Sequence, residues 1–202
     1  MKSVVLIAGH SNVRGKDNGA VYDGRLEGVL AVELRRSIFQ EYNKLIGNNV
    51  KLVKQLVADS DNTTTAETVR LLSNISDKGR FIWGKDWILE NPMLIDLHFN
   101  AAQNPSATGT EVVVDHDANQ TEIQFATAMA KTISDTLKIK NRGVKSEILS
   151  HRGRLGILHI TNNSILIEVC FISNKRDIES LQQNHTLLSA NIAKLILDYI
   201  VS

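Results

Sequence analysis

Residues 4–10 read Val4–Val5–Leu6–Ile7–Ala8–Gly9–His10, an apolar run that ends on a histidine. Two later runs have the same form: Met93–Leu94–Ile95–Asp96–Leu97 before His98, and Ile165–Leu166–Ile167 before Glu168. Short apolar runs of this kind are typical of strands buried on both faces of a sheet. Such a strand rarely carries His or Glu, because a charge held away from water is costly unless it is paired or binds a metal. The three runs therefore predict both a buried sheet and a functional site.

Segments with helical spacing alternate with strand candidates along the chain. Helical spacing of apolar residues covers 27–45, 120–138 and 186–200, and also Ala66, Val69, Leu72 and Ile75. Strands are expected over residues 3–9, 50–57, 93–99, 110–115 and 164–172. This alternation predicts an α/β fold, with a mostly parallel mixed sheet flanked by helices on both faces. The length of 202 residues fits a single domain over residues 1–202.

The composition argues against several classes of function. The apolar fraction of 43% and the charged fraction of 22% are ordinary for a soluble protein, and a net charge of +1 gives no field that favours nucleic acid. No stretch approaches the roughly 20 apolar residues of a membrane span. Cys170 is the only cysteine, which excludes an internal disulfide and a cysteine-based zinc site. The first apolar run is too short for a secretory signal, so we expect synthesis in the cytoplasm without a signal peptide.

The polar residues of these runs are the candidate site. His10 and His98 both lie at the end of their strand runs, and ligands of open α/β sheets bind beyond the carboxyl ends of the strands. With Glu27 and Glu168 they supply two imidazoles and two carboxylates, the donor types of a catalytic zinc site. Each has a simpler alternative. A lone histidine is more often structural, and Glu168 could instead form a buried salt bridge to Arg142 or Arg152.

Several motifs, taken together and in order, carry a family resemblance. They are Leu6–Ile7–Ala8–Gly9–His10, Arg25–Leu26–Glu27, Asp96–Leu97–His98–Phe99–Asn100–Ala101, Gly109–Thr110–Glu111–Val112–Val113–Val114, Asn141–Arg142–Gly143–Val144–Lys145 and Ile165–Leu166–Ile167–Glu168–Val169–Cys170–Phe171–Ile172–Ser173–Asn174. In this order the chain resembles the zinc-dependent N-acetylmuramoyl-L-alanine amidases of the amidase-3 type. The resemblance runs from residue 6 to residue 174, most of the chain.

The resemblance implies roles for particular residues. Zinc would be held by His10, Glu27 and His98, and Glu168 would be the catalytic carboxylate. The alternative for Glu27 is a first-turn glutamate favoured by the helix dipole, and Glu33 would then be the replacement ligand. The implied substrate is peptidoglycan, cut at the amide bond between N-acetylmuramic acid and L-alanine.

Two further residues are candidates for substrate contact. Asn100 lies two residues beyond His98, on the same face of the strand. His159 precedes the Glu168 strand and could help to hold an oxyanion, although a structural role is the alternative.

The chain also departs from the family pattern. Ala8 replaces the usual proline, and Val57–Ala58–Asp59 replaces the usual Thr-Arg. The segment 79–90 is longer and more aromatic than in the family, and its Trp83 and Trp87 have helical spacing typical of core residues. These differences bear on substrate detail rather than on the metal site.

Rival functions remain open at this stage. A compact phage endolysin, acting on the cell wall after release, is the leading interpretation, and a catalytic domain from a longer protein is the alternative. A zinc carboxypeptidase or another amidohydrolase acting on a different wall peptide bond would use similar residues. A non-catalytic module that binds wall fragments is the third possibility. The set of His10, Glu27, His98 and Glu168 favours an enzyme, because a binding module has no need of a general base.

Overall fold

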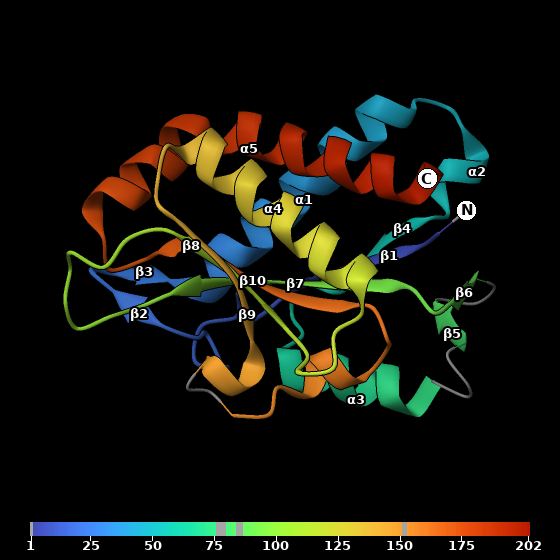
Figure 1. Ribbon diagram of the computed structural model, residues 1–202, viewed down its shortest axis with the longest axis horizontal. Helices are drawn as coiled ribbons and strands as arrows, with labels where there is room; N and C mark the ends of the chain where they lie inside the picture. Colours follow the sequence, from blue (N-terminus) through green and yellow to red (C-terminus); the bar gives the residue numbers. More distant parts are fainter. Residues whose placement is uncertain (1, 76–79, 84–86, 151–152) are drawn as a thin grey trace.

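A six-stranded sheet forms the centre of the molecule (Figure 1). The computed structural model describes residues 2–75, 80–83, 87–150 and 153–202. Across the sheet the strands are β4 (Leu56–Ala58), β1 (Val4–Ala8), β7 (Met93–Asn100), β10 (Ser164–Phe171), β8 (Thr110–Val114) and β9 (Asn141–Ser146). The first four are parallel, whereas β8 runs antiparallel to β10 and β9 runs parallel to β8. The prediction of a mostly parallel mixed sheet is confirmed.

Helices cover both faces of the sheet, as predicted. On one face lie α1 (Glu27–Ile46), α4 (Gln120–Leu137) and α5 (Lys175–Val201), and on the other lie α3 (Thr65–Ile75) and the short 3-10 helix η2 (Gly156–His159) (Figure 1). Strand β7 separates the two cores, because Ile95 and Leu97 pack towards α1, α4 and α5 while Leu94 packs with α3 and η2. Among the helices that the structure describes, none has the length and apolar character needed to cross a membrane.

Two short ribbons lie outside the main sheet. One pairs β2 (Val21–Tyr22) with β3 (Arg25–Leu26) and leads directly into α1. The other pairs β5 (Arg80–Trp83) with β6 (Trp87–Glu90), and Trp83 and Trp87 are register partners across it. Their helical spacing therefore does not reflect a helix. Of the aromatic segment 79–90, residues 79 and 84–86 lie outside the described residues.

Two predicted elements need correction. The expected strand over 50–57 is a short helix, α2 (Val50–Val53), followed by the three-residue strand β4. The Asn49 side chain accepts a hydrogen bond from Lys51 N and starts this helix. The final helix begins at Lys175, eleven residues before the predicted start at residue 186, because the Asn174 side chain caps it by accepting a hydrogen bond from Asp177 N.

Candidate metal centre

The loop after β1 presents the first candidate ligand, His10. Its Nδ1 lies 3.0 Å from Asp17 Oδ1, and the same carboxylate oxygen accepts a hydrogen bond from Gly19 N. With Nδ1 held in this way, Nε2 faces Glu27 Oε1 at 3.4 Å. Asp17 therefore fixes the orientation of the ring and leaves one imidazole nitrogen for the centre.

Glu27 is the first residue of α1, and the ribbon β2–β3 delivers it to the centre. Its carboxylate is buried and accepts two backbone hydrogen bonds, from Phe99 N to Oε1 at 3.0 Å and from Ala20 N to Oε2 at 2.8 Å. The start of a helix also favours a negative charge. These contacts place the side chain between the two histidines, which a simple surface first-turn glutamate would not require.

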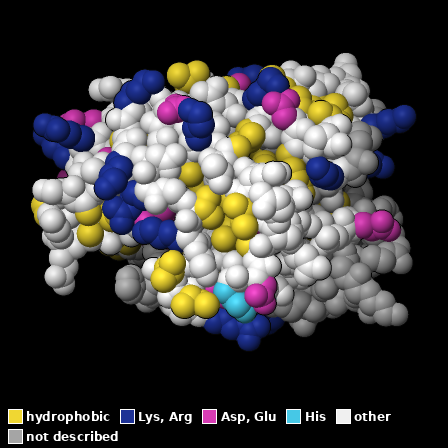
Figure 2. Space-filling view, in the orientation of Figure 1, with side chains coloured by type: hydrophobic (Ala, Val, Ile, Leu, Met, Phe, Trp, Pro, Cys, Tyr) yellow, Lys and Arg dark blue, Asp and Glu magenta, His cyan; other side chains and the backbone are white. Residues whose placement is uncertain are grey.

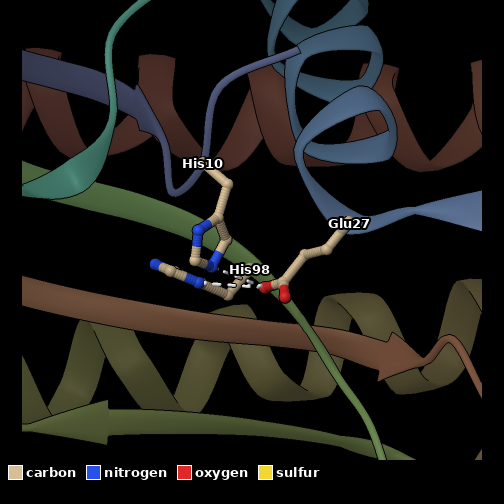
Figure 3. A group of neighbouring side chains, drawn as sticks. All are labelled: His10, Glu27 and His98. Carbon is tan, nitrogen blue, oxygen red and sulfur yellow. Dashed lines mark hydrogen bonds and ion pairs between the residues drawn. The ribbon is translucent and has the colours of Figure 1, made fainter. Parts of the chain in front are cut away.

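His98 lies near the carboxyl end of β7, on the face that α3 covers. Its Nδ1 is 3.0 Å from Glu27 Oε1, and its Nε2 is 3.0 Å from Asp96 Oδ2. The His98 and His10 rings meet edge to face, with centroids 4.8 Å apart. Figure 3 shows the two imidazoles and the Glu27 carboxylate turned towards one another from three separate segments.

The donor set fits a zinc ion. One ligand atom from each of His10, Glu27 and His98 lies within 4.8 Å of the others, and the two closest contacts to Glu27 Oε1 are 3.0 and 3.4 Å. Zinc bonds of about 2.0–2.1 Å in a tetrahedral site separate neighbouring ligand atoms by about 3.3 Å. Two imidazoles and one carboxylate are also a common ligand set of catalytic zinc, which keeps a fourth position open.

Two glycines allow this close packing. A Cβ on Gly9 would lie 2.2 Å from His98 Nε2, and a Cβ on Gly19 would lie 2.5 Å from Glu27 Oε2 and from His10 Cδ2. Gly19 also has a φ of +68°, which disfavours other residues. The backbone at Gly9 and Gly19 therefore lies so close to the centre that any larger residue would collide with its side chains.

Replacing Gly9 by alanine is expected to weaken zinc binding by about ten- to hundredfold, because the His98 ring must leave its contacts with Asp96 and Glu27. Competition with a chromogenic chelator measures this affinity. Gly156→Ala is the matched control, since a Cβ there would meet only Val69 Cγ1 at 3.6 Å. Equal affinities of the two variants would show that His98 has room to move.

In the metal-free protein, electrostatic interactions within the centre favour the charged forms of Glu27, His98 and His10. Burial by itself would raise the pKa of Glu27, but hydrogen bonds and charges from His10 and His98 outweigh it and lower that pKa far below its usual range. Burial opposes charge on His98 too, yet Asp96 and Glu27 raise its pKa well above 6.5. For His10, Glu27 likewise outweighs burial and raises the pKa. Protons on the imidazoles therefore occupy the centre when no metal is bound.

Zinc affinity is therefore expected to fall as the pH drops, starting above pH 6.5. Zinc needs neutral imidazoles, and the raised pKa values of His98 and His10 keep both rings protonated at higher pH than usual. The loss should approach about tenfold per pH unit for each proton displaced. Isothermal titration in buffers of different ionisation enthalpy measures the proton release. Affinity that stays constant between pH 8 and pH 6 would contradict this description of the site.

Glu168 lies beside these residues in the sheet. It is fully buried on β10, and its register partner on β7 is His98, one strand spacing of about 4.8 Å away. Register partners in a parallel sheet point to the same face, so the Glu168 carboxylate shares the face of His98. Arg142, one suggested partner of Glu168, instead forms an ion pair with Glu111 at 2.6 Å. Arg152, the other suggested partner, lies outside the described residues.

The two suggested substrate contacts, Asn100 and His159, lie in different parts of the structure. Asn100 lies at the end of β7, where its Nδ2 donates to Glu111 Oε1 at 3.3 Å. His159 lies in η2, with Nδ1 2.9 Å from Asp115 Oδ2 and Nε2 3.0 Å from Glu147 Oε1. The structure does not bring His159 to the centre of His10, Glu27 and His98.

Sequence reasoning gave no role to two residues of this centre, Asp17 and Asp96. Both carboxylates hold the ring nitrogens that do not face the centre. Asp96 had a visible signal, since an aspartate two residues before His98 on one strand face is unusual in an apolar run. Asp17 had none, because its position depends on the path of the loop after β1.

Comparison with known proteins identifies the family and agrees with this fold. Residues 4–200 match the N-acetylmuramoyl-L-alanine amidase family, amidase-3, and the chain belongs to this family. No curated protein sequence showed significant similarity to the chain.

Solved structures show the same fold. The N-acetylmuramoyl-L-alanine amidase from Clostridium difficile 630 is 22% identical, with a TM-score of 0.72 over 100% of this chain and 98% of its own. The catalytic domain of CwlV, an amidase from Bacillus (Paenibacillus) polymyxa var. colistinus, is 21% identical, with a TM-score of 0.68 over 100% and 99%. The catalytic domain of the CD27L endolysin targeting Clostridia difficile is 20% identical, with a TM-score of 0.66 over 100% and 97%.

Proposed function

We propose that this chain is a zinc-dependent amidase that cleaves the bond between the lactyl group of N-acetylmuramic acid and L-alanine in peptidoglycan. The observation that carries the proposal is the convergence of His10, Glu27 and His98 in a member of the amidase family. Peptidoglycan as the substrate follows from that family. The zinc requirement and the residue roles are our proposal.

In this proposal each residue of the site has a separate task. His10, Glu27 and His98 hold the ion, and Asp17 and Asp96 keep the two rings turned towards it. Zinc bound there would polarise the scissile carbonyl and lower the pKa of water to near 7.

Glu168 transfers the proton. It accepts a proton from the attacking water and donates it to the nitrogen of L-alanine as the C–N bond breaks. The products are the lactyl carboxylate and a stem peptide with a free amine, and no covalent enzyme intermediate is formed. Asn100, at the end of β7 and two residues beyond His98, helps to position the substrate.

Two synthetic substrates distinguish this function from the nearest rival. One is an N-acetylmuramoyl-L-alanyl peptide whose carboxyl end is blocked, and the other is a sugar-free stem peptide that ends in D-alanine. The zinc-loaded protein is expected to release a peptide with a free L-alanine amine from the first and to leave the second intact. Cleavage of the second alone would identify a carboxypeptidase, and tight binding without cleavage would identify a binding module.

We also propose that the chain acts as an endolysin, made in the cytoplasm and active on the wall after release. Its likeness in fold to an endolysin catalytic domain is compatible with this. The test is production in a bacterium with susceptible peptidoglycan, followed by turbidity. We expect lysis only after chloroform permeabilises the membrane, and lysis without it would contradict the proposal.

A further inference from the structure

A second group of histidines and carboxylates lies at the other end of the strands from the candidate metal centre. Asp115 and His116 follow β8, Glu147 begins the 3-10 helix η1 (Glu147–Leu149) after β9, and His159 ends η2. Because β8 runs antiparallel to β10, Asp115 lies four residues along the strand from the level of Glu168. At about 3.4 Å per residue, this separates the two levels by about 14 Å.

Three side-chain atoms of this group face one another. Asp115 Oδ1 lies 2.6 Å from His116 Nδ1, and Glu147 Oε1 lies 3.3 Å from the same nitrogen. One ligand atom from each of these residues lies within 4.8 Å of the others. A tetrahedral zinc ion separates neighbouring ligand atoms by about 3.3 Å. Glu147 and His116 already have this separation, and Asp115 would move slightly away from His116 to admit the ion.

The remaining atom of each side chain has its own partner. His159 Nδ1 contacts Asp115 Oδ2 at 2.9 Å, Asp117 Oδ2 contacts His116 Nε2 at 3.1 Å, and Leu155 N donates to Glu147 Oε2 at 2.8 Å. His159 Nε2 lies near both oxygens of Glu147, 3.2 Å from the outer Oε2 and 3.0 Å from the inner Oε1. Metal sites commonly hold their ligands by such outer contacts, which fix the orientation of the inner atoms.

Charge and access also suit a cation. Asp115 and Glu147 supply two negative charges, and Glu147 is 3% exposed, so its charge needs a nearby positive partner. His116 is about half exposed, with 46% of its side chain accessible, which leaves a route from solvent. Figure 2 shows a histidine beside an acidic side chain at the surface near the lower edge of the view.

We propose that Asp115, His116 and Glu147 bind a second divalent transition-metal ion of the zinc type, with His159 holding the two carboxylates in place. A nitrogen donor with two carboxylates suits such an ion. The distance from Glu168 excludes a paired catalytic centre, whose ions lie about 3.5–4 Å apart. The second ion would instead join the ends of β8 and β9 and stabilise this edge of the sheet.

Metal content tests this site without reference to catalysis. The wild-type protein and two variants are stripped with a chelator, equilibrated with zinc, freed of loosely bound ions and analysed by mass spectrometry of the elements. We expect two zinc ions per wild-type chain and one per His116→Gln chain. His185→Gln, a histidine change within α5, is the matched control and should keep two.

A second measurement separates this site from the first. In His98→Ala, zinc should still bind at one ion per chain and raise the melting temperature, and the additional change His116→Gln should abolish both effects. If His98→Ala does not fold, the wild-type and His116→Gln ratios decide alone. Equal ratios in those two proteins would overturn the proposal and leave a protonated His116 paired with carboxylates. A fall from one ion to none would support this site and contradict the first.

Discussion

Glu168→Gln is expected to lower kcat by between about a hundredfold and ten-thousandfold while the zinc content stays at the wild-type level. Glutamine has nearly the same shape but cannot accept the proton of the attacking water. The Glu168 side chain is fully buried beside its register partner His98. Glu168 is not itself one of the candidate ligands, so the substitution leaves His10, Glu27 and His98 in place. Steady-state kinetics with a muramoyl-L-alanyl substrate, together with metal analysis, measures both quantities.

Glu111→Gln is the matched control for this variant. Glu111 is the register partner of Glu168 on β8, but Lys145 and Arg142 each contact its carboxylate at 2.6 Å. Burial alone would raise the pKa of Glu111, and these two cations outweigh burial and lower it. Such a carboxylate is a poor base, so we expect a loss below about tenfold. A Glu168→Gln protein with wild-type kcat would exclude Glu168 as the base.

His98→Ala is expected to lose the zinc ion held by His10, Glu27 and His98 together with all detectable amidase activity, and to lower the free energy of unfolding by about 3–5 kcal/mol. His98 contacts both Asp96 and Glu27, which are 0% and 3% exposed. Within the described part of the chain, Asp96 Oδ1 has no hydrogen-bond partner, and Oδ2 contacts His98. Removing the imidazole therefore leaves a buried charge without compensation.

His10→Ala separates the metal effect from the stability effect. His10 is more exposed, and its outer partner Asp17 has a side chain that is 55% accessible to solvent. We expect the same loss of zinc with a smaller loss of stability, measured by urea unfolding of the metal-free proteins. Equal unfolding energies of the two variants would contradict the role assigned to the Asp96–His98 contact.

The buried strands of this fold were predictable from local sequence, because an apolar run that leads into a histidine indicates a buried strand close to its carboxyl end. His10 and His98 were found in this way. Glu27 lies in no such run, and its assignment as a zinc ligand came from the family resemblance. Its place between the histidines depends on the ribbon β2–β3 and on backbone donors at Ala20 and Phe99, which are set by tertiary structure.

Other features depend on contacts that sequence periodicity does not reveal. Strand β9 is polar, as edge strands often are, and gave no strand signal. The first turns of α5 carry few apolar residues, so the apolar spacing that predicts this helix begins only near residue 186. His159 contacts Asp115, and Asp115 lies at the far end of the strands from the metal centre because β8 runs antiparallel to β10.

The most direct test of the central claim follows the ion and the bond in one experiment. Metal-stripped protein is mixed with purified peptidoglycan, zinc is added in steps, and the released peptides are identified by mass spectrometry. We predict no release before zinc is added, and then stem peptides that begin with a free L-alanine and are intact at the D-amino-acid end. Full activity of the metal-free protein, or products cut at any other bond, would contradict the proposed function.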